Sequence, residues 1–226
     1  MGDLESSRSL QPLFVTDFDG TVTQHDFFKL AVEHLLPAET PDFWAEYRSK
    51  QITHFEAMRK YYAAIRKSEE DVLKIIEQMH PDPLLAEGVS ELRQCGWEVV
   101  IVSNGCDWYI NKILASFGVE IEVLTSPSRF VEGQGLLMDL PKDSPFFWAE
   151  VGIDKAAVVQ HGLEKERVVA FAGNGYPDLP AARLVAPDLR FAREDLADAL
   201  EREGLPFQRF SRWLEVAKSL TQRGAV

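Results

Sequence analysis

Three continuous apolar segments predict strands that are buried on both faces. They are LFVTD (13–17), WEVVIVS (97–103) and RVVAFAG (167–173). Such runs without polar alternation are typical of parallel strands in α/β proteins. Each run is followed by a polar or glycine-rich turn and then by a helical pattern, and the predicted helices cover residues 87–95, 106–116, 154–162 and 178–184. Since parallel strands require crossover helices, the pattern predicts an α/β fold with a Rossmann-like parallel sheet.

Residues 26–82 contain no convincing strand. Helix-start patterns occur at Thr40 followed by Pro41, at a capping box of Thr53 and Glu56, and at Ser68. We therefore expect three or four helices to form a cap over residues 26–82, inserted after the first strand of a core made of residues 1–25 and 83–226. Within that core, EGQG (132–135) separates two short apolar runs and predicts a hairpin turn.

Polar segments follow the three predicted strands. DFDGT comes after the first strand, SNG after the second and GNGYPD after the third. Ligands of open α/β sheets bind beyond the carboxyl ends of the strands. We therefore expect these three segments to meet in one site.

Asp17 and Asp19 stand two residues apart, which places both carboxylates on one side of a near-extended chain. Buried carboxylates are costly unless they are paired, hydrogen-bonded or bound to a metal. Gly20 permits a sharp exit from the strand, and Thr21 can hold that turn through its hydroxyl. A structural calcium loop is the alternative, but Thr21 and Phe28 stand where an EF-hand carries acids. The pair therefore indicates a cation site or a chemical task.

The net charge of −12, from 36 acidic and 24 basic residues, changes the choice of partner. No basic stripe is present, so we expect neither nucleic acid nor a membrane as a partner, and an anionic substrate would need local positive charge.

The apolar runs are too short to span a bilayer, and the first 13 residues read as a polar lead-in rather than a secretory signal. Cys95 and Cys106 suggest no disulfide framework, which predicts a cytoplasmic protein.

The segment DFDGTVT resembles the first motif of the haloacid dehalogenase-like superfamily, whose commonest members are Mg²⁺-dependent phosphatases. The later motifs follow in order, with Ser103 in VIVSNG, Lys155 in GIDKAAV and Asp178 in GNGYPD. The helical insert resembles the cap of the phosphoserine-phosphatase-type subgroup. The stretch LRFAREDLADALEREGLPFQRF resembles the methionine-salvage branch, whose members dephosphorylate 2-hydroxy-3-keto-5-methylthiopentenyl-1-phosphate. The resemblance implies an Mg²⁺-dependent hydrolase of a small phosphorylated metabolite.

The same resemblance implies a role for each acid of the first motif. Asp17 would be the nucleophile and a metal ligand, forming an aspartyl-phosphate. Asp19 would protonate the leaving oxygen and then activate water, with its backbone carbonyl on Mg²⁺. Electrostatics support this arrangement, because a phosphate and a carboxylate about 4 Å apart repel by about 4 kcal/mol per charge pair at a dielectric constant near 20. Mg²⁺ and Lys155 would cancel that repulsion locally.

The second motif is predicted to bind phosphate. Ser103 can offer its hydroxyl, and Asn104 and Gly105 their backbone N–H groups, at the start of the following helix. We also place Gly20 among the phosphate-binding residues. Relatives often carry Gly where Asn104 stands, and Asn is the residue after Gly that best tolerates a left-handed backbone.

Asn174 departs from the pattern of the family, which usually has Asp there as an Mg²⁺ ligand. An amide oxygen can bind a hard cation but brings no charge, so we expect a weaker site formed by Asp17, Asp19, Asn174 and Asp178. Asp26 stands where relatives of the phosphoserine type carry a substrate-binding Glu. It fits either a contact to substrate or a helix N-cap.

Several alternatives stay open at this level. The aspartyl-phosphate can pass to another hydroxyl, as in a phosphotransferase or mutase, and Asn174 also admits a non-catalytic protein that binds a phosphorylated metabolite. The substrate can be a methionine-salvage intermediate or resemble phosphoserine. Trp44, Tyr47 and Phe55 fit a homodimer contact or internal packing. The five histidines show no paired ligand spacing and receive no role.

Overall fold

A computed structural model describes residues 10–222, so most of the predicted lead-in lies outside the described residues. A six-stranded parallel sheet forms its centre, in the order β10-β9-β8-β1-β2-β3. The strands are β1 (Leu13–Thr16), β2 (Glu98–Cys106), β3 (Glu122–Ser126), β8 (Val169–Gly173), β9 (Arg190–Ala192) and β10 (Gln208–Arg209). The predicted α/β class and the three predicted strands are confirmed.

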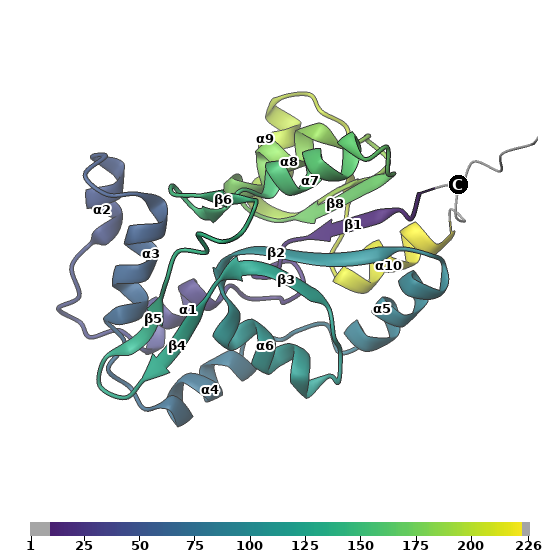
Figure 1. Ribbon diagram of the computed structural model, residues 1–226. Coiled ribbons are helices and arrows are strands. Elements are labelled where there is room, and N and C mark those ends of the chain that lie inside the picture. The colour runs from purple at the N-terminus through teal and green to yellow at the C-terminus, as the bar shows by residue number, and fades with distance from the viewer. Residues whose placement is uncertain (1–9, 223–226) are drawn as a thin grey trace, which may run out of the picture.

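Helices cover both faces of the sheet, as Figure 1 shows. One layer holds α7 (Lys155–Glu164), α8 (Leu179–Leu184) and α9 (Glu194–Arg202), and the other holds α5 (Leu85–Gln94), α6 (Asp107–Ser116) and α10 (Trp213–Gln222). Alternate side chains of β1 feed the two layers, since Val15 packs with the first and Phe14 with the second. Burial on both faces explains the continuous apolar pattern of this strand.

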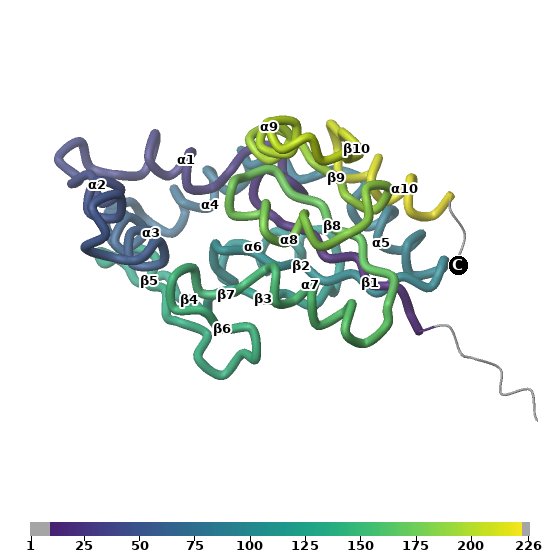
Figure 2. Tube along the Cα trace, turned by 90° about the horizontal axis from the view of Figure 1, so that it is seen from above, coloured from purple at the N-terminus to yellow at the C-terminus, as the bar shows by residue number. Residues whose placement is uncertain are grey.

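Four helices occupy the predicted insert: α1 (Phe27–His34), α2 (Phe43–Arg48), α3 (His54–Ala63) and α4 (Glu69–Glu77). They lie beside the sheet rather than over its faces, as Figure 2 shows from above. The capping box at the start of α3 and the Ser68 cap of α4 are confirmed. The predicted start at Thr40 and Pro41 is wrong. Asp42 caps α2 by accepting from the N–H of Ala45 at 3.1 Å, whereas the Thr40 hydroxyl donates to the Pro37 carbonyl at 2.7 Å within a turn.

The predicted hairpin at 132–135 is also confirmed, as the turn between β4 (Ser128–Val131) and β5 (Gly135–Met138). Gly135 has a φ of +82°, and a Cβ there would lie 2.5 Å from the Tyr62 carbonyl oxygen of α3. The hairpin therefore packs closely on the helical insert. A second, shorter hairpin joins β6 (Phe147–Trp148) and β7 (Gly152–Ile153). The division into a cap and a core at residues 25/26 and 82/83 stays a prediction.

The helices of residues 10–222 include none with the length and apolar character needed to cross a membrane.

Candidate active site

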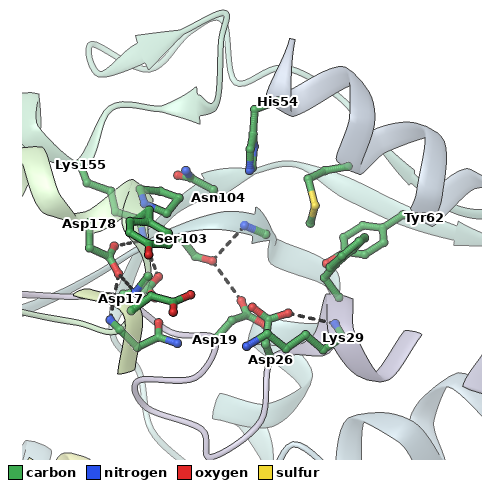
Figure 3. A pocket seen from close by; sticks show the side chains of 18 of the residues that line it. Asp17, Asp19, Asp26, Lys29, His54, Tyr62, Ser103, Asn104, Lys155 and Asp178 are labelled. Atoms are coloured by element: carbon green, nitrogen blue, oxygen red, sulfur yellow. Dashed lines mark hydrogen bonds and ion pairs between the residues drawn. The ribbon is translucent and has the colours of Figure 1, made fainter. Parts of the chain in front are cut away.

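The polar segments at the carboxyl ends of β1, β2 and β8 meet in one pocket of about 230 Å³ (Figure 3). Its lining includes the predicted residues Asp17, Asp19, Asp26, Ser103, Asn104, Gly105, Lys155, Asn174 and Asp178. The pairing of the strands explains the convergence, because Thr16 at the end of β1 is in register with Ile101 of β2 and Ala172 of β8. Gly20, the remaining predicted site residue, lies against Asn174, since a Cβ at Gly20 would lie 2.2 Å from Asn174 Nδ2.

A bulge at the end of β2 presents the second motif to the pocket. Pairing with β3 runs regularly to Val102 and resumes at Cys106, which leaves residues 103–105 out of register. Ser103, Asn104 and Gly105 therefore belong to the strand, and α6 begins only at Asp107. The left-handed turn considered for Asn104 is wrong, since this residue lies in extended strand and has no positive φ.

Lys155 joins the first and fourth motifs through two short ion pairs. Its Nζ lies 2.6 Å from Asp17 Oδ1 and 2.6 Å from Asp178 Oδ1, and all three side chains are buried. Asp154 caps α7 by accepting from the N–H groups of Ala156 and Ala157, which fixes Lys155 at the first position of the helix. The ammonium thus stands between two carboxylates that would otherwise repel each other.

Burial and the nearby Asp178 carboxylate raise the pKa of Asp17 to about 8, while the Lys155 ammonium opposes this rise. The pKa of Lys155 is also raised, because its contacts with Asp17 and Asp178 outweigh its burial. Lys155 is therefore a permanent cation in this site. A further positive charge near Asp17 would keep this carboxylate ionised at neutral pH.

Asp19 is held by three donors from three elements. Tyr109 Oη of α6 lies 2.6 Å from Asp19 Oδ2, and Ser103 Oγ lies 3.2 Å from the same oxygen. The N–H of Phe27, at the start of α1, donates to Asp19 Oδ1 at 3.1 Å. Gly105 makes room for this arrangement, since a Cβ there would lie 1.8 Å from Tyr109 Oη. The carboxylate is therefore fixed in one orientation.

Burial and the neighbouring Asp26 carboxylate raise the pKa of Asp19 to about 7, against the effect of its hydrogen bonds. An acid with this pKa can donate and accept a proton near neutral pH. Asp26 caps α1 by accepting from the N–H of Lys29 at 3.2 Å, and burial raises the pKa of Asp26 as well. The helix cap predicted for Asp26 is confirmed, while its contact with substrate stays a prediction.

Asn174 lies at the end of β8 with its amide turned toward Asp17. Thr21 Oγ1 lies 3.2 Å from Asn174 Oδ1 and 3.4 Å from Asp17 Oδ2, so the Asp17 and Asn174 oxygens converge on one hydroxyl. The Asp17 and Asn174 oxygens are hard donors of the kind that Mg²⁺ prefers. Within residues 10–222 no three His, Cys, Asp or Glu side chains are grouped to hold a metal ion. Binding of Mg²⁺ at this site would therefore depend on the Asn174 amide oxygen. The Asp17 and Asn174 oxygens fit that ion.

Asp178 is fully engaged within the protein. Its Oδ1 binds Lys155, and its Oδ2 accepts from the N–H groups of Asn174 and Gly175, each at 2.9 Å. These contacts orient the lysine and close the turn after β8. A direct bond from Asp178 to a metal stays a prediction.

The helical insert supplies the opposite wall of the pocket. Phe28, Trp44, Met58 and Tyr62 give it an apolar lining, and His54 points from α3 toward Asn104 (Figure 3). Burial and nearby Lys155 lower the pKa of His54 to about 4, so this imidazole is neutral. Its Nδ1 and the Oδ1 of Asn104 are buried without a hydrogen-bond partner. Both atoms would therefore gain from a polar partner.

Sequence reasoning missed His54, Met58 and Tyr109. Each is an ordinary helix residue by pattern, and a pocket position looks the same as a core position in a single sequence. The capping box that begins α3 was the one feature that could have pointed to His54, because it fixes this residue at the first turn of the helix.

Comparisons with known proteins agree with this geometry. The model of the family "haloacid dehalogenase-like hydrolase" matches residues 14–183. A 2-hydroxy-3-keto-5-methylthiopentenyl-1-phosphate phosphatase of Brevibacillus brevis is 27% identical over 210 residues, which cover 91% of this chain and 93% of the relative. The enzyme of the same name from Bacillus velezensis is 25% identical over 88% of this chain and 86% of its own length. An apo phosphoserine phosphatase structure is 20% identical with a TM-score of 0.59, covering 92% of this chain and 98% of the other, and shows the same fold.

Proposed function

The chain belongs to the haloacid dehalogenase-like hydrolases and is a phosphomonoester phosphatase, and we propose that it works through an aspartyl-phosphate on Asp17. The observation that carries the proposal is the meeting of Asp17, Asp19 and Lys155 in one buried pocket beneath an apolar wall. Loss of phosphate release in an Asp17→Asn variant tests it.

In the first step, a carboxylate oxygen of Asp17 attacks phosphorus and the ester P–O bond breaks. Asp19 gives its proton to the leaving alkoxide, which departs as an alcohol. The pKa of about 7 supports this assignment, because a useful fraction of Asp19 is protonated near neutral pH. Ser103 Oγ, 3.2 Å from Asp19 Oδ2, stands at the same side of the pocket to hold a phosphate oxygen.

In the second step, ionised Asp19 takes a proton from water, and the hydroxide formed attacks phosphorus. The bond between phosphorus and Asp17 breaks, releasing inorganic phosphate and restoring the carboxylate. Lys155 stays 2.6 Å from Asp17 Oδ1 and neutralises negative charge in both steps.

Asp17 and Asn174, with the backbone carbonyl of Asp19, would hold Mg²⁺. When bound, the ion supplies the positive charge that draws the phosphate dianion to a carboxylate in a chain of net charge −12. Convergence of the Asp17 and Asn174 oxygens on Thr21 supports this placement.

For the substrate, we propose a phosphomonoester with uncharged polar groups near the phosphate and an apolar tail. Trp44 and Met58 offer the tail an apolar surface, and His54 and Asn104 offer unpaired polar atoms to a hydroxyl or carbonyl group. The two relatives named above carry in their name a substrate of this type, with hydroxyl, keto and methylthio groups. Phosphoserine has a charged amine and carboxylate, which Asp26 and Lys29 of the same wall could meet but which suit the apolar surface of Trp44 and Met58 less well. Comparing the kcat/KM values of these two phosphomonoesters tests the choice.

We also propose that the enzyme is cytoplasmic, which the free thiols of Cys95 and Cys106 support. A homodimer stays a prediction. Phe55 and Trp44 were two of the residues on which that prediction rests. In the structure both make contacts within the chain, since Phe55 is buried and Trp44 lines the pocket.

A further inference from the structure

The Asn174 side chain is enclosed by three neighbours. Thr21 Oγ1 lies 3.2 Å from its Oδ1, and its Nδ2 donates to Glu194 Oε2 at 3.1 Å. Gly20, with a φ of +69°, closes the third side, because a Cβ at that position would lie 2.2 Å from Asn174 Nδ2. The amide therefore has one well-defined position.

The chemistry of the neighbours decides which end of the amide faces which way. An amide has an oxygen that accepts and an NH₂ group that donates, and its two ends are nearly equal in shape. The Glu194 carboxylate can only accept, so it must face the NH₂ end. The oxygen is thereby turned toward Thr21 and Asp17, where a cation ligand is needed.

The backbone and the carboxylate of Glu194 are tied to their neighbours, although the side chain is 42% exposed. It has a φ of +49°, an uncommon conformation for a residue other than glycine. The flanking backbone is tied to the end of β8, since the N–H of Leu196 donates to the Asn174 carbonyl at 2.9 Å and that of Arg193 to the Gly173 carbonyl at 3.3 Å. The Arg193 guanidinium pairs with Glu194 Oε1 at 3.1 Å, which leaves Oε2 for Asn174. Such strained positions persist where the surrounding contacts determine them.

We infer that Glu194 is a positioning residue that keeps the Asn174 oxygen directed into the cation site. The inference rests on the Mg²⁺ site of the proposed function. An aspartate at position 174 would need no such partner, because both of its ends are oxygens. Glu194 would then face a like charge. The acid on α9 and the amide that follows β8 therefore work as a pair.

Calorimetric titration of the free enzyme with Mg²⁺ tests the pair without reference to turnover. In Glu194→Leu the amide loses its acceptor, and we expect about tenfold weaker Mg²⁺ binding, in the range typical of residues that orient metal ligands. Glu194→Gln keeps an acceptor oxygen and should weaken Mg²⁺ binding less than Glu194→Leu does. Glu201→Leu is the matched control, because it removes the same charge from the same helix at a position whose carboxylate pairs with Arg209 rather than Asn174.

Glu194→Leu in an Asn174→Asp background separates the effect of Glu194 on the orientation of the amide from the effect of its charge. There Glu194→Leu should no longer weaken Mg²⁺ binding and should tighten it, since a repulsive pair of carboxylates is removed. Unchanged affinity in Glu194→Leu alone, or equal weakening in both backgrounds, would overturn the role of Glu194. Absence of Mg²⁺ binding in both the parent and Asn174→Asp would overturn the metal assignment of the proposed function as well.

Discussion

The phenol of Tyr109 donates a 2.6 Å hydrogen bond to Asp19 Oδ2, although the two residues are 90 positions apart. Tyr109 is buried within the core cluster, so its hydroxyl is fixed by the packing of α6. A hydrogen bond to an ionised carboxylate lowers its pKa, and here it opposes the effect of burial. The proposed acid and base is therefore tuned by a residue outside the recognised motifs.

Replacing Tyr109 by Phe should move the alkaline limb of the pH–rate profile to higher pH. Asp19 must be protonated to act as the acid, so kcat/KM for an alkyl phosphate should fall as pH rises through its pKa, about 7. Loss of the phenol destabilises the carboxylate and raises this pKa, which should shift the limb by about one pH unit. Tyr47→Phe, which removes a phenol outside the pocket lining, is the matched control. An unmoved limb in Tyr109→Phe would show that Asp19 does not set it.

Replacing Asn174 by Asp should tighten Mg²⁺ binding by roughly tenfold, because the change adds a full negative charge to an oxygen ligand. The Glu194 carboxylate, 3.1 Å from the present amide nitrogen, should limit this gain. Calorimetry measures the affinity, and Asn111→Asp at an exposed position is the control for added charge. Equal affinities in the parent and Asn174→Asp would mean that this side chain is not a ligand.

Replacing Lys155 by Met should destabilise the metal-free protein by about 3–5 kcal/mol at pH 8, because two buried carboxylates lose their shared cation. The loss should grow as pH rises above about 8 and level off below it. Lys155 lowers the pKa of Asp17, so without the ammonium this pKa rises above about 8. At higher pH the variant still holds a proton that the parent has released, and its stability keeps falling with pH while that of the parent no longer does. Chemical denaturation in a chelator at several pH values measures this, with the exposed Lys218→Met as control. A pH-independent loss would contradict the account.

Replacing Met58 by Ser should lower kcat/KM for a phosphomonoester with an apolar tail by about tenfold, through lost apolar contact in the pocket. The volume-conserving Met58→Leu should keep the preference. Steady-state kinetics with the methylthio substrate of the relatives and with phosphoserine measure both variants. Equal effects of Ser and Leu would argue against a tail bound at Met58.

The centre of the fold could be predicted because its strands are buried on both faces and their sequences show it directly. β1, β8 and the first part of β2 are continuous apolar runs, and the polar segments at the carboxyl ends of these strands meet because parallel strands end at one edge. The strands β9 and β10 were not predicted. β10 has two residues, both exposed, and such short edge strands leave no periodic pattern.

The candidate site was predictable where a motif fixed the local backbone and not where tertiary contacts decide. Asp17, Lys155 and Asp178 meet as expected because Asp17 directly follows β1, Lys155 begins the helix α7, and Asp178 lies in the turn between β8 and α8. Glu194 and Tyr109 could not be found in this way, since they reach the site from α9 and α6 by contacts that span 20 and 90 positions. Asp42 rather than Thr40 caps α2. Thr and Asp side chains can both cap a helix, and the sequence alone does not decide between two such residues that lie close together.

The most direct test is phosphate release from 2-hydroxy-3-keto-5-methylthiopentenyl-1-phosphate and phosphoserine, with and without Mg²⁺, by the parent enzyme and by Asp17→Asn. Asp17→Asn keeps the shape of the side chain and removes the nucleophilic charge, and circular dichroism confirms that both proteins are folded. We predict Mg²⁺-dependent release that favours the methylthio compound and falls to background in Asp17→Asn. Turnover that persists in folded Asp17→Asn would contradict an aspartyl-phosphate on this residue.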